Sequence, residues 1–152
     1  MMLVNDSGAL FLQGVKTCVS VISERKLNYI NKKEVIDFLE RCFAAIKSGG
    51  RIILQTPNAE SPLGMSVRYG DFTHEVGFTP SALRRLLELI GFSNVEVREA
   101  GPVPFGCGMA TSFRAFLWAI IRRGLAIWNV IECGGKGSGI YTRVFLISGT
   151  KP

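Results

Sequence analysis

The stretch from Asn31 to Asn58 constrains the fold of this 152-residue chain more than any other. Asn31 can cap a helix, and Glu34 lies three residues further on, where its side chain can reach back to the free amide of residue 31. Apolar residues then recur at helical spacing, at Val35, Ile36, Leu39, Cys42, Phe43 and Ile46. This pattern predicts an amphipathic helix with one buried face.

The residues after this helix predict a glycine turn and a buried strand. Segment 51–57 is apolar and β-branched at first and ends at Pro57, which cannot donate a hydrogen bond to a sheet. Segment 17–23 has a similar small and β-branched composition. Strand, helix and strand form a βαβ crossover, which predicts two parallel strands in a sheet with covered faces. Ligands of such sheets bind beyond the carboxyl ends of the strands, so chemistry is expected at Asn58 and after it.

The second half of the chain predicts one more helix and two more strands. Thr79 and Pro80 form a helix start, and Gly91 provides a left-handed end. The buried stripe of this helix is predicted at Leu83, Leu86, Leu87 and Ile90. Segment 94–99 alternates between apolar and polar residues, and segment 140–148 is expected to pair with it in the antiparallel direction.

The polar loop at 59–78 is the predicted site of substrate binding, because long loops of a compact domain are usually functional. Arg68, Tyr69, Asp71 and Glu75, together with Asn58 before the loop, are candidate substrate-binding residues. His74, the only histidine, is the candidate catalytic base, since imidazole changes charge near neutral pH. The alternative is that these groups shape and pack the loop, with His74 bonded to a neighbouring carboxylate.

Charge is distributed unevenly along the chain. The net charge is +6, and residues 112–152 contribute +5 of it, with six Lys or Arg against Glu132. This balance favours a phosphate, an anionic lipid or an acidic partner near the C-terminal part, or else a solvated basic face. The composition, with 47% hydrophobic and 20% charged residues, is that of one folded domain.

The segment 112–131 is strongly apolar and has three interpretations. It can belong to the core, it can form a lid over the acceptor pocket, or it can lie at a membrane interface. In the last case Phe113, Phe116, Trp118 and Trp128 would enter the lipid and the arginines would meet phosphates. Nucleic-acid binding is not expected, because no recognised module accompanies the aromatic and basic residues.

Three further patterns bear on cofactors and location. Cys18, Cys42, Cys107 and Cys133 lack metal-binding spacing, which predicts reduced thiols in the cytoplasm and no metal site. Residues 1–16 lack a signal-peptide pattern and predict a loop or a short helix. The glycine-rich run from Glu132 to Gly139 imitates a cofactor loop, but a strand follows it where a helix is required, so a flexible connector is expected.

The motifs together resemble the second half of a class I S-adenosylmethionine-dependent methyltransferase. Lys47-Ser48-Gly49-Gly50 is similar to the Lys-Pro-Gly-Gly turn of that family, with Ser in place of Pro. His74 followed by the run Phe78-Thr79-Pro80-Ser81-Ala82-Leu83 matches a second family motif. The tail is similar to bacterial members associated with surface-polysaccharide synthesis. The resemblance covers about residues 19–150.

This resemblance implies an α/β protein with a partial doubly wound, Rossmann-like sheet of parallel strands plus a C-terminal antiparallel hairpin. Strands 17–23, 51–57, 94–99 and 140–148 would be the fourth to seventh of the family, the seventh lying between the fifth and the sixth. The first strands of the family fold, with its glycine-rich donor loop, are missing. The chain is then a single truncated domain, 1–152, in which 17–100 holds the crossover, loop, helix and strand, 105–139 is a helical insertion and 140–150 is the last strand.

The implied activity is methyl transfer from S-adenosylmethionine to an oxygen or nitrogen atom of a small-molecule or glycan-type acceptor, incomplete in this chain. Arg25, Lys26, Leu27 and Asn28 occupy the place of the family's cofactor contacts after the fourth strand. The alternative is a non-catalytic remnant or interaction module, which pairs with another chain through an open sheet edge at 17–23. The expected location is cytoplasmic, peripheral to the inner face of the membrane.

Overall fold

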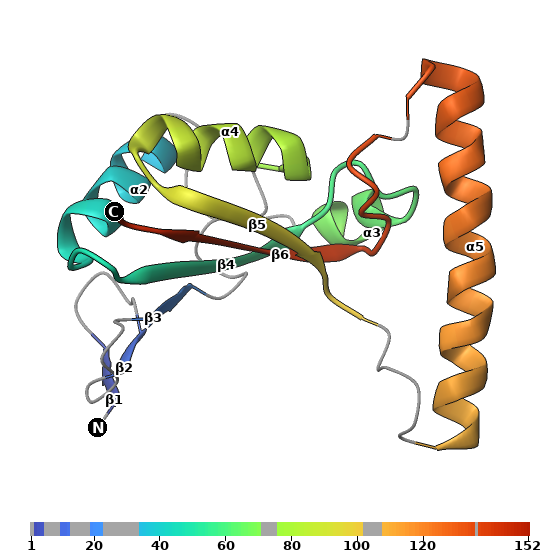
Figure 1. Ribbon diagram of the computed structural model, residues 1–152, viewed down its shortest axis with the longest axis horizontal. Coiled ribbons are helices and arrows are strands. Elements are labelled where there is room, and N and C mark those ends of the chain that lie inside the picture. Colours follow the sequence, from blue (N-terminus) through green and yellow to red (C-terminus); the bar gives the residue numbers. More distant parts are fainter. Residues whose placement is uncertain are drawn as a thin grey trace.

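The computed structural model describes residues 2–4, 10–12, 19–22, 34–70, 76–101, 108–135 and 137–152. Figure 1 shows the arrangement of its helices and strands, with a layered body at one end and a long helix at the other. In chain order the elements are β1 (Met2–Val4), β2 (Leu10–Leu12), β3 (Val19–Ile22), α2 (Glu34–Ala45), β4 (Arg51–Pro57), α3 (Gly64–Tyr69), α4 (Pro80–Ile90), β5 (Ser93–Glu99), α5 (Met109–Cys133) and β6 (Val144–Thr150).

The described strands form one mixed sheet of six strands in the order β1-β2-β3-β4-β6-β5. β3 and β4 pair in parallel, which agrees with the predicted crossover. β6 lies between β4 and β5 and is antiparallel to both, which confirms the predicted C-terminal hairpin and its place in the sheet. One parallel pair does not make a doubly wound sheet, and the longest pairings of the described strands are antiparallel.

The N-terminal segment contains two strands that the sequence did not predict. β2 pairs with β3 in the antiparallel direction, with Leu10 opposite Val21 and Phe11 opposite Ser20, and β1 pairs with β2. The prediction of an open edge at 17–23 is therefore wrong, because β2 occupies that edge. Strands of three residues are too short to show a periodic pattern, which is why only a loop or short helix was expected.

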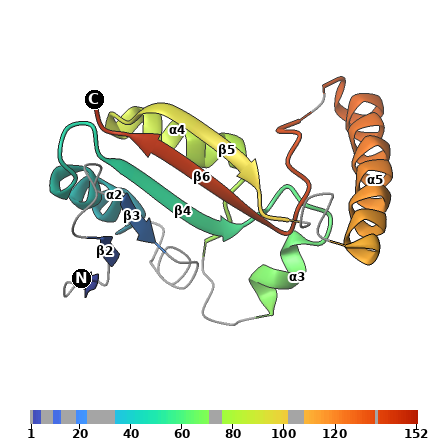
Figure 2. The same ribbon diagram turned by 60° about the horizontal axis from the view of Figure 1, so that its bottom comes forward.

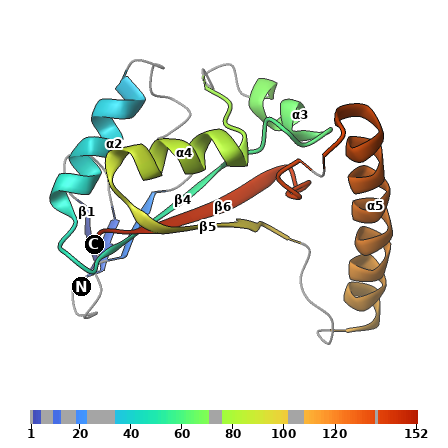
Figure 3. The same ribbon diagram turned by 45° about the horizontal axis from the view of Figure 1, so that its top comes forward.

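The main core lies between the sheet and two helices, α2 and α4, which cover the same face (Figures 1 and 3). Alternate residues of β4 face this core, and Ile52, Leu54 and Thr56 are fully buried. They meet Phe145 and Ile147 of β6 and the apolar stripes of the helices. The sequence predicted covered faces on both sides, whereas both of these helices lie on one side.

The helix stripes follow the sequence with one exception. Leu83 and Leu87 of α4 are fully buried, and Leu86 and Ile90 pack partly against them, as predicted. On α2, Ile36 is 47% exposed, so its predicted burial is wrong. Phe38 packs against the core instead, because a residue three positions after Val35 shares its face of the helix and a residue one position after does not.

The ends of α4 have the predicted caps. The Oγ1 atom of Thr79 accepts a hydrogen bond from the amide of Ala82 at 3.2 Å, and Pro80 occupies the first turn. Gly91 adopts a φ of 114° at the other end. The amide of Phe92 donates to the carbonyl of Leu87 at 3.0 Å, which completes a Schellman motif. The predicted cap of α2 at Asn31 lies outside the described residues.

The polar loop and the last strand differ from their predictions in extent. The loop contains the short helix α3, and its first glycine allows a close approach, because a Cβ atom at Gly64 would lie 1.7 Å from the carbonyl oxygen of Asn58. The last strand begins at Val144 and not at residue 140. The backbone groups of residues 140–142 instead bond side chains of Asn58, Ser61 and Glu99.

Helix α5 has 25 residues and stands across the rim of the sheet, beyond the carboxyl end of β4 (Figures 1 and 2). Ala115 is its only buried residue. The interpretation of this segment as part of the core is therefore wrong. No helix among the described residues combines the length and the apolar character that crossing a bilayer requires.

Candidate functional site

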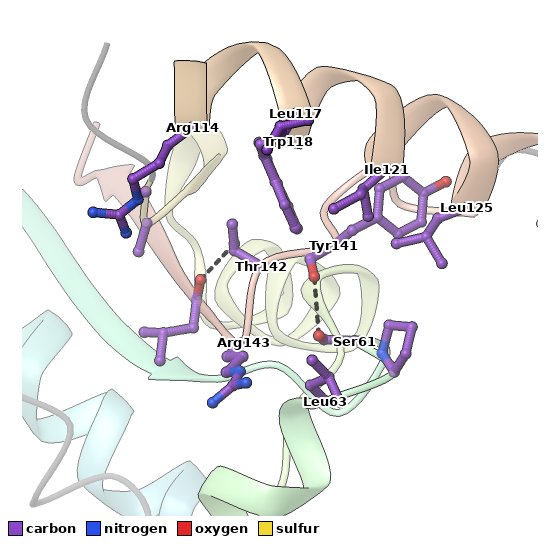
Figure 4. Close-up of a pocket in the computed structure, with 14 residues that line it drawn as sticks. Ser61, Leu63, Arg114, Leu117, Trp118, Ile121, Leu125, Tyr141, Thr142 and Arg143 are labelled. Atoms are coloured by element: carbon purple, nitrogen blue, oxygen red, sulfur yellow. Dashed lines mark hydrogen bonds between the residues drawn. The ribbon is translucent and has the colours of Figure 1, made fainter. Parts of the chain in front are cut away.

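A cavity of about 640 Å³ lies between the inner face of α5 and the rim of the sheet (Figure 4). Four segments form its walls: the loop after β4 with Ser61 and Leu63, the end of β5 at Ala100, the residues before β6, and α5. These segments are far apart in the sequence and meet only in the fold. The cavity lies at the edge of the sheet where the sequence predicted a ligand.

Asn58 fixes the end of β4 to the segment that leads into β6. Its Nδ2 atom donates hydrogen bonds to the carbonyl oxygens of Ile140 at 2.8 Å and Thr142 at 3.0 Å. Its Oδ1 atom accepts a hydrogen bond from the amide of Glu60 at 3.0 Å. The side chain is fully buried, so in this conformation Asn58 has no surface for the predicted substrate contact. Its role is to hold two walls of the cavity together.

A second buried contact fastens the loop after β4. The hydroxyl of Ser61 donates a hydrogen bond to the carbonyl oxygen of Tyr141 at 2.9 Å, which Figure 4 draws as a dashed line. The hydroxyl of Thr142 bonds the carbonyl of Val144 at 2.7 Å and tightens the entry into β6. Ser61, Tyr141 and Thr142 are all buried. The floor of the cavity is thus built from satisfied polar groups, which makes it a defined surface.

Polar links hold α5 to the other walls. The guanidinium of Arg122 lies 3.6 Å from the carboxylate of Glu99 at the end of β5. The other carboxylate oxygen of Glu99 accepts a hydrogen bond from the amide of Tyr141 at 3.0 Å. Further along α5, the Nδ2 atom of Asn129 bonds the hydroxyl of Tyr141 at 3.3 Å. Glu99 and Tyr141 therefore join the helix to the sheet.

The glycine-rich connector after α5 is closed to an anionic ligand. The Oε1 atom of Glu60 accepts a hydrogen bond from the amide of Ser138 at 2.8 Å, so a carboxylate of the chain itself already occupies this backbone amide. A Cβ atom at Gly137 would lie 2.6 Å from the same oxygen. The connector leads into β6 and not into a helix. It joins α5 to the sheet, and the described part of it is not a cofactor loop.

The walls of the cavity are mainly apolar, with positive charge on one side. Figure 4 shows the guanidinium groups of Arg114 and Arg143 on one side and the side chains of Ile121 and Leu125 on the other. Neither guanidinium forms an ion pair or a hydrogen bond with the part of the chain that the structure describes. Such a cavity suits a ligand that has an apolar body and an anionic group.

Trp118 offers one more polar group to a ligand. Its ring extends from α5 toward Thr142 (Figure 4), and its Nε1 atom is buried without a hydrogen-bond acceptor among the described residues. A buried donor without an acceptor costs about 1–3 kcal/mol, so a ligand oxygen within reach of this N–H would gain stabilisation. Trp118 therefore faces the cavity.

The remaining candidate residues are spread over several places. Arg68 and Tyr69 belong to α3, and Tyr69 is 69% exposed outside the cavity walls. The catalytic candidate and two carboxylates, His74, Asp71 and Glu75, lie outside the described residues. The same is true of the cofactor candidates Arg25, Lys26, Leu27 and Asn28.

Sequence reasoning missed most of the cavity wall. The loop residues Ser61 and Leu63 carried no motif that marks them. The signals that pointed here were the carboxyl edge of the sheet, the basic residues of 112–152 and the interpretation of segment 112–131 as a lid over an acceptor pocket. No group of three or more metal-ligating side chains occurs in the part of the chain that the structure describes.

Cys42 is a core thiol and not a candidate nucleophile. Burial raises the pKa of its thiol from 9.0 to about 11. It therefore stays protonated at neutral pH, and the thiolate is the reactive form. Cys133, at the end of α5, is exposed, and both thiols are free.

Comparison with known proteins supports the fold. No protein-family model and no curated protein matches the sequence. Solved structures do match the fold, among them two methyltransferases. A SAM-dependent methyltransferase from Archaeoglobus fulgidus shares 18% identity over 90% of this chain and 60% of that one, with a TM-score of 0.58. The S-adenosylmethionine-dependent methyltransferase SibL in its apo form shares 15% identity over 87% of this chain and 30% of that one, with a TM-score of 0.50. The chain thus has the fold of these methyltransferases and spans less than two thirds of the length of each.

The described residues do not provide a cradle for S-adenosylmethionine. A nucleoside cofactor is usually held by a glycine-rich turn between a strand and the start of a helix. The glycine-rich segment described here follows α5, and Glu60 occupies its Ser138 amide. The cavity between α5 and the rim of the sheet also lacks such a turn. The donor contacts predicted at 25–28 stay a prediction.

Proposed function

We propose that the chain takes part in S-adenosylmethionine-dependent methyl transfer and that the cavity below α5 holds the methyl acceptor. One observation carries the proposal: a chain with a methyltransferase fold has a cavity of about 640 Å³ at the carboxyl end of β4. That is the edge of an α/β sheet where ligands bind. Methyl transfer needs an acceptor atom aligned with the sulfonium methyl group, and a walled cavity provides such alignment.

The chemistry of the walls defines the class of acceptor. Leu125 and Ile121 favour an apolar or aromatic portion, and Arg114 and Arg143 favour a carboxylate or phosphate. A small-molecule or glycan-type acceptor that carries both features, for example a glycan phosphate linked to an apolar group, would fit. The methylated atom is an oxygen or nitrogen, as the resemblance implies.

The residues of this chain orient the acceptor and do little covalent chemistry. The arginines hold the anionic group, the apolar wall excludes water from the bound portion, and the N–H of Trp118 can donate to an acceptor oxygen. A hydroxyl or ammonium acceptor must lose a proton during transfer, and His74 is the candidate base for that step. S-adenosylmethionine supplies the methyl group. The two free thiols, Cys42 and Cys133, are consistent with the cytoplasm as the compartment of the reaction.

The test is a transfer assay with tritium-labelled S-adenosylmethionine and a panel of alkyl and aryl glycoside phosphates, with the uncharged glycosides beside them. We expect tritium in the charged acceptors and at least about tenfold less in the uncharged ones, since an anion paired with arginine contributes about 1.5–3 kcal/mol. Leu125→Trp, which fills the cavity, should lower transfer to the charged acceptors. Leu89→Trp, at a residue that is 85% exposed on α4, is the matched control and should leave transfer unchanged.

Two outcomes would contradict the proposal. One is equal transfer by the Leu125→Trp variant and the unchanged chain, which would place the acceptor elsewhere. The other is a folded protein that transfers no tritium to any acceptor and binds no donor.

A further inference from the structure

The outer face of α5 carries an apolar stripe, interrupted near Arg123, that the described part of the protein does not cover. Its side chains are 50–92% exposed and follow one another at spacings of four, three, four, seven and four residues: Met109, Phe113, Phe116, Ile120, Ile127 and Ile131. At 3.6 residues per turn these positions share one side of the helix. Ala115, Trp118 and Leu125, which face the sheet, lie on the opposite side.

The exposed apolar surface is wider than the seam of a two-helix pair. Leu117, Trp128 and Val130 flank the stripe and are 42–66% exposed. The apolar positions therefore cover about half of the circumference of α5, whereas a coiled-coil seam uses two positions in seven. A broad, gently curved apolar face suits a fluid surface, which can surround side chains of different sizes.

The charges of α5 are those that an anionic surface attracts. Its basic residues are Arg114, Arg122 and Arg123, and its only acidic residue is Glu132 near its end. The Nε1 atom of Trp128 bonds the carboxylate of Glu132. Arg123 borders the apolar stripe and forms no ion pair with a described residue. Long arginine side chains beside an apolar stripe can reach phosphate groups while the stripe enters the acyl region.

We propose that α5 docks the protein on the surface of a bilayer that contains anionic lipids, with its outer face in the interface and its inner face on the cavity. The helix lies in the plane of the interface, since no described helix meets the requirements for spanning a membrane. This docking is independent of the proposed methyl transfer, because it uses the opposite face of the helix.

A second copy of the chain is a less suitable occupant of this face. The midpoint of α5 is Ile121, so an antiparallel pair of α5 helices joined by their outer faces would place Arg123 of one copy close to Arg123 of the other. In a parallel pair, each arginine would lie beside the same arginine of the second copy. Glu132 is the only carboxylate on the helix and lies more than two turns from Arg123. Like charges would therefore repel in either pair.

The experiment is flotation of the purified full chain with two kinds of vesicle, phosphatidylcholine alone and phosphatidylcholine with about one third phosphatidylglycerol. We expect the chain to float with the anionic vesicles and to be released as salt is raised. Phe113→Glu combined with Ile120→Glu should lower the partition coefficient by more than about tenfold, since each side chain would lose its apolar burial. Arg123→Gln should lower it by about fivefold, the share of one basic residue near the surface.

The control is Leu89→Glu, which makes the same kind of substitution at one exposed apolar residue on α4 and should leave flotation unchanged. Circular dichroism establishes that each variant is folded. The comparison of the two vesicles uses the unchanged chain, so it does not depend on the folding of any variant. The proposal is overturned if the unchanged chain floats with neither vesicle, or equally well with both at all salt concentrations. It is also overturned if sedimentation shows a dimer that Phe113→Glu dissociates and vesicles do not bind.

Discussion

Helices α4 and α5 are both rich in apolar residues, yet α4 packs into the core and α5 lies almost entirely on the surface. On α4 the apolar residues form one stripe, with Arg84, Arg85 and Glu88 on the other faces, and Leu83 and Leu87 are fully buried. On α5 the apolar residues surround the helix, and only Ala115 is buried. The arrangement of the polar residues, and not the apolar content, decides where a helix packs.

The two helices are also held by different forces. α4 is held by apolar burial against β5, β6 and α2. α5 is held at a few points by polar contacts, chiefly Arg122 with Glu99 and Asn129 with Tyr141. Exposed polar contacts contribute little to stability, so the contribution of α5 to the free energy of unfolding should be small. The side chains on both faces of α5 are therefore available for binding.

The largest expected effect is the difference between matched truncations in the two helices. Leu87→Ala in α4 should lower the free energy of unfolding by about 2–5 kcal/mol, because it leaves a cavity beside Phe145 and Ile147. Ile120→Ala in α5 should lower it by about 0.5 kcal/mol or less, because Ile120 is already half exposed. Urea unfolding followed by circular dichroism measures both. Similar losses in the two variants would mean that α5 belongs to the cooperative core.

The two thiols give a second comparison between the regions. Burial raises the pKa of Cys42 to about 11, so its thiolate fraction at pH 8 is about a hundredfold lower than that of a thiol with the ordinary value of 9.0. Iodoacetamide at pH 8 should therefore modify Cys133 at least about a hundredfold faster than Cys42, as read from peptide masses. The rate at Cys42 should rise about tenfold per pH unit from pH 8 and level off only above about pH 11. Equal rates at pH 8 would show that α2 is not packed as described.

The next prediction concerns the buried side-chain amide of Asn58, which joins the end of β4 to the segment before β6. Asn58→Asp removes the donor that serves the carbonyls of Ile140 and Thr142 and places a carboxylate beside them. We expect a loss of about 1–3 kcal/mol in the free energy of unfolding at neutral pH, measured by urea titration. Part of this loss should be recovered at low pH, because the protonated carboxyl can donate one hydrogen bond. Unchanged stability would argue for a role in ligand binding and not in the fold.

The smallest expected effect concerns the ion pair that fastens α5. Arg122→Gln should change the free energy of unfolding by less than about 1 kcal/mol, because the Arg122 side chain is 51% exposed to solvent. The same variant should weaken acceptor binding, since it loosens one wall of the cavity. Arg123→Gln, which removes a charge from the other side of the helix, is the control and should leave acceptor binding unchanged. A loss of several kcal/mol in Arg122→Gln would contradict the peripheral position of α5.

Much of the sheet-and-helix body could be predicted from the sequence, because its elements are long and periodic. β4, α4 and β5 were expected within a residue or two, and the Thr79 and Gly91 caps follow from side-chain chemistry. β1, β2 and α3 were missed, since three to six residues do not establish a period. The position of α5 could not be predicted, because a helix that is apolar on all sides does not indicate which side is covered.

The cavity was the least predictable feature. Its walls come from segments separated by up to about 80 residues, joined by contacts such as Ser61 with Tyr141 and Asn58 with Thr142. The polar residues of the loop at 59–78, including His74, were predicted as site residues because they are close in sequence. Arg114 and Arg143 belong to the basic region that favoured an anionic partner, but only the fold shows that both line one cavity.

Equilibrium dialysis of the full chain against tritium-labelled S-adenosylmethionine tests the central claim, that this methyltransferase fold serves methyl transfer, most directly. We predict saturable retention at one site per chain, displaced by S-adenosylhomocysteine and insensitive to Leu125→Trp, which fills only the acceptor cavity. The claim would be contradicted if a folded chain retained no more donor than the buffer at donor concentrations up to about 1 mM. A Kd of about 1 mM corresponds to a binding free energy of about 4 kcal/mol, which is weak binding.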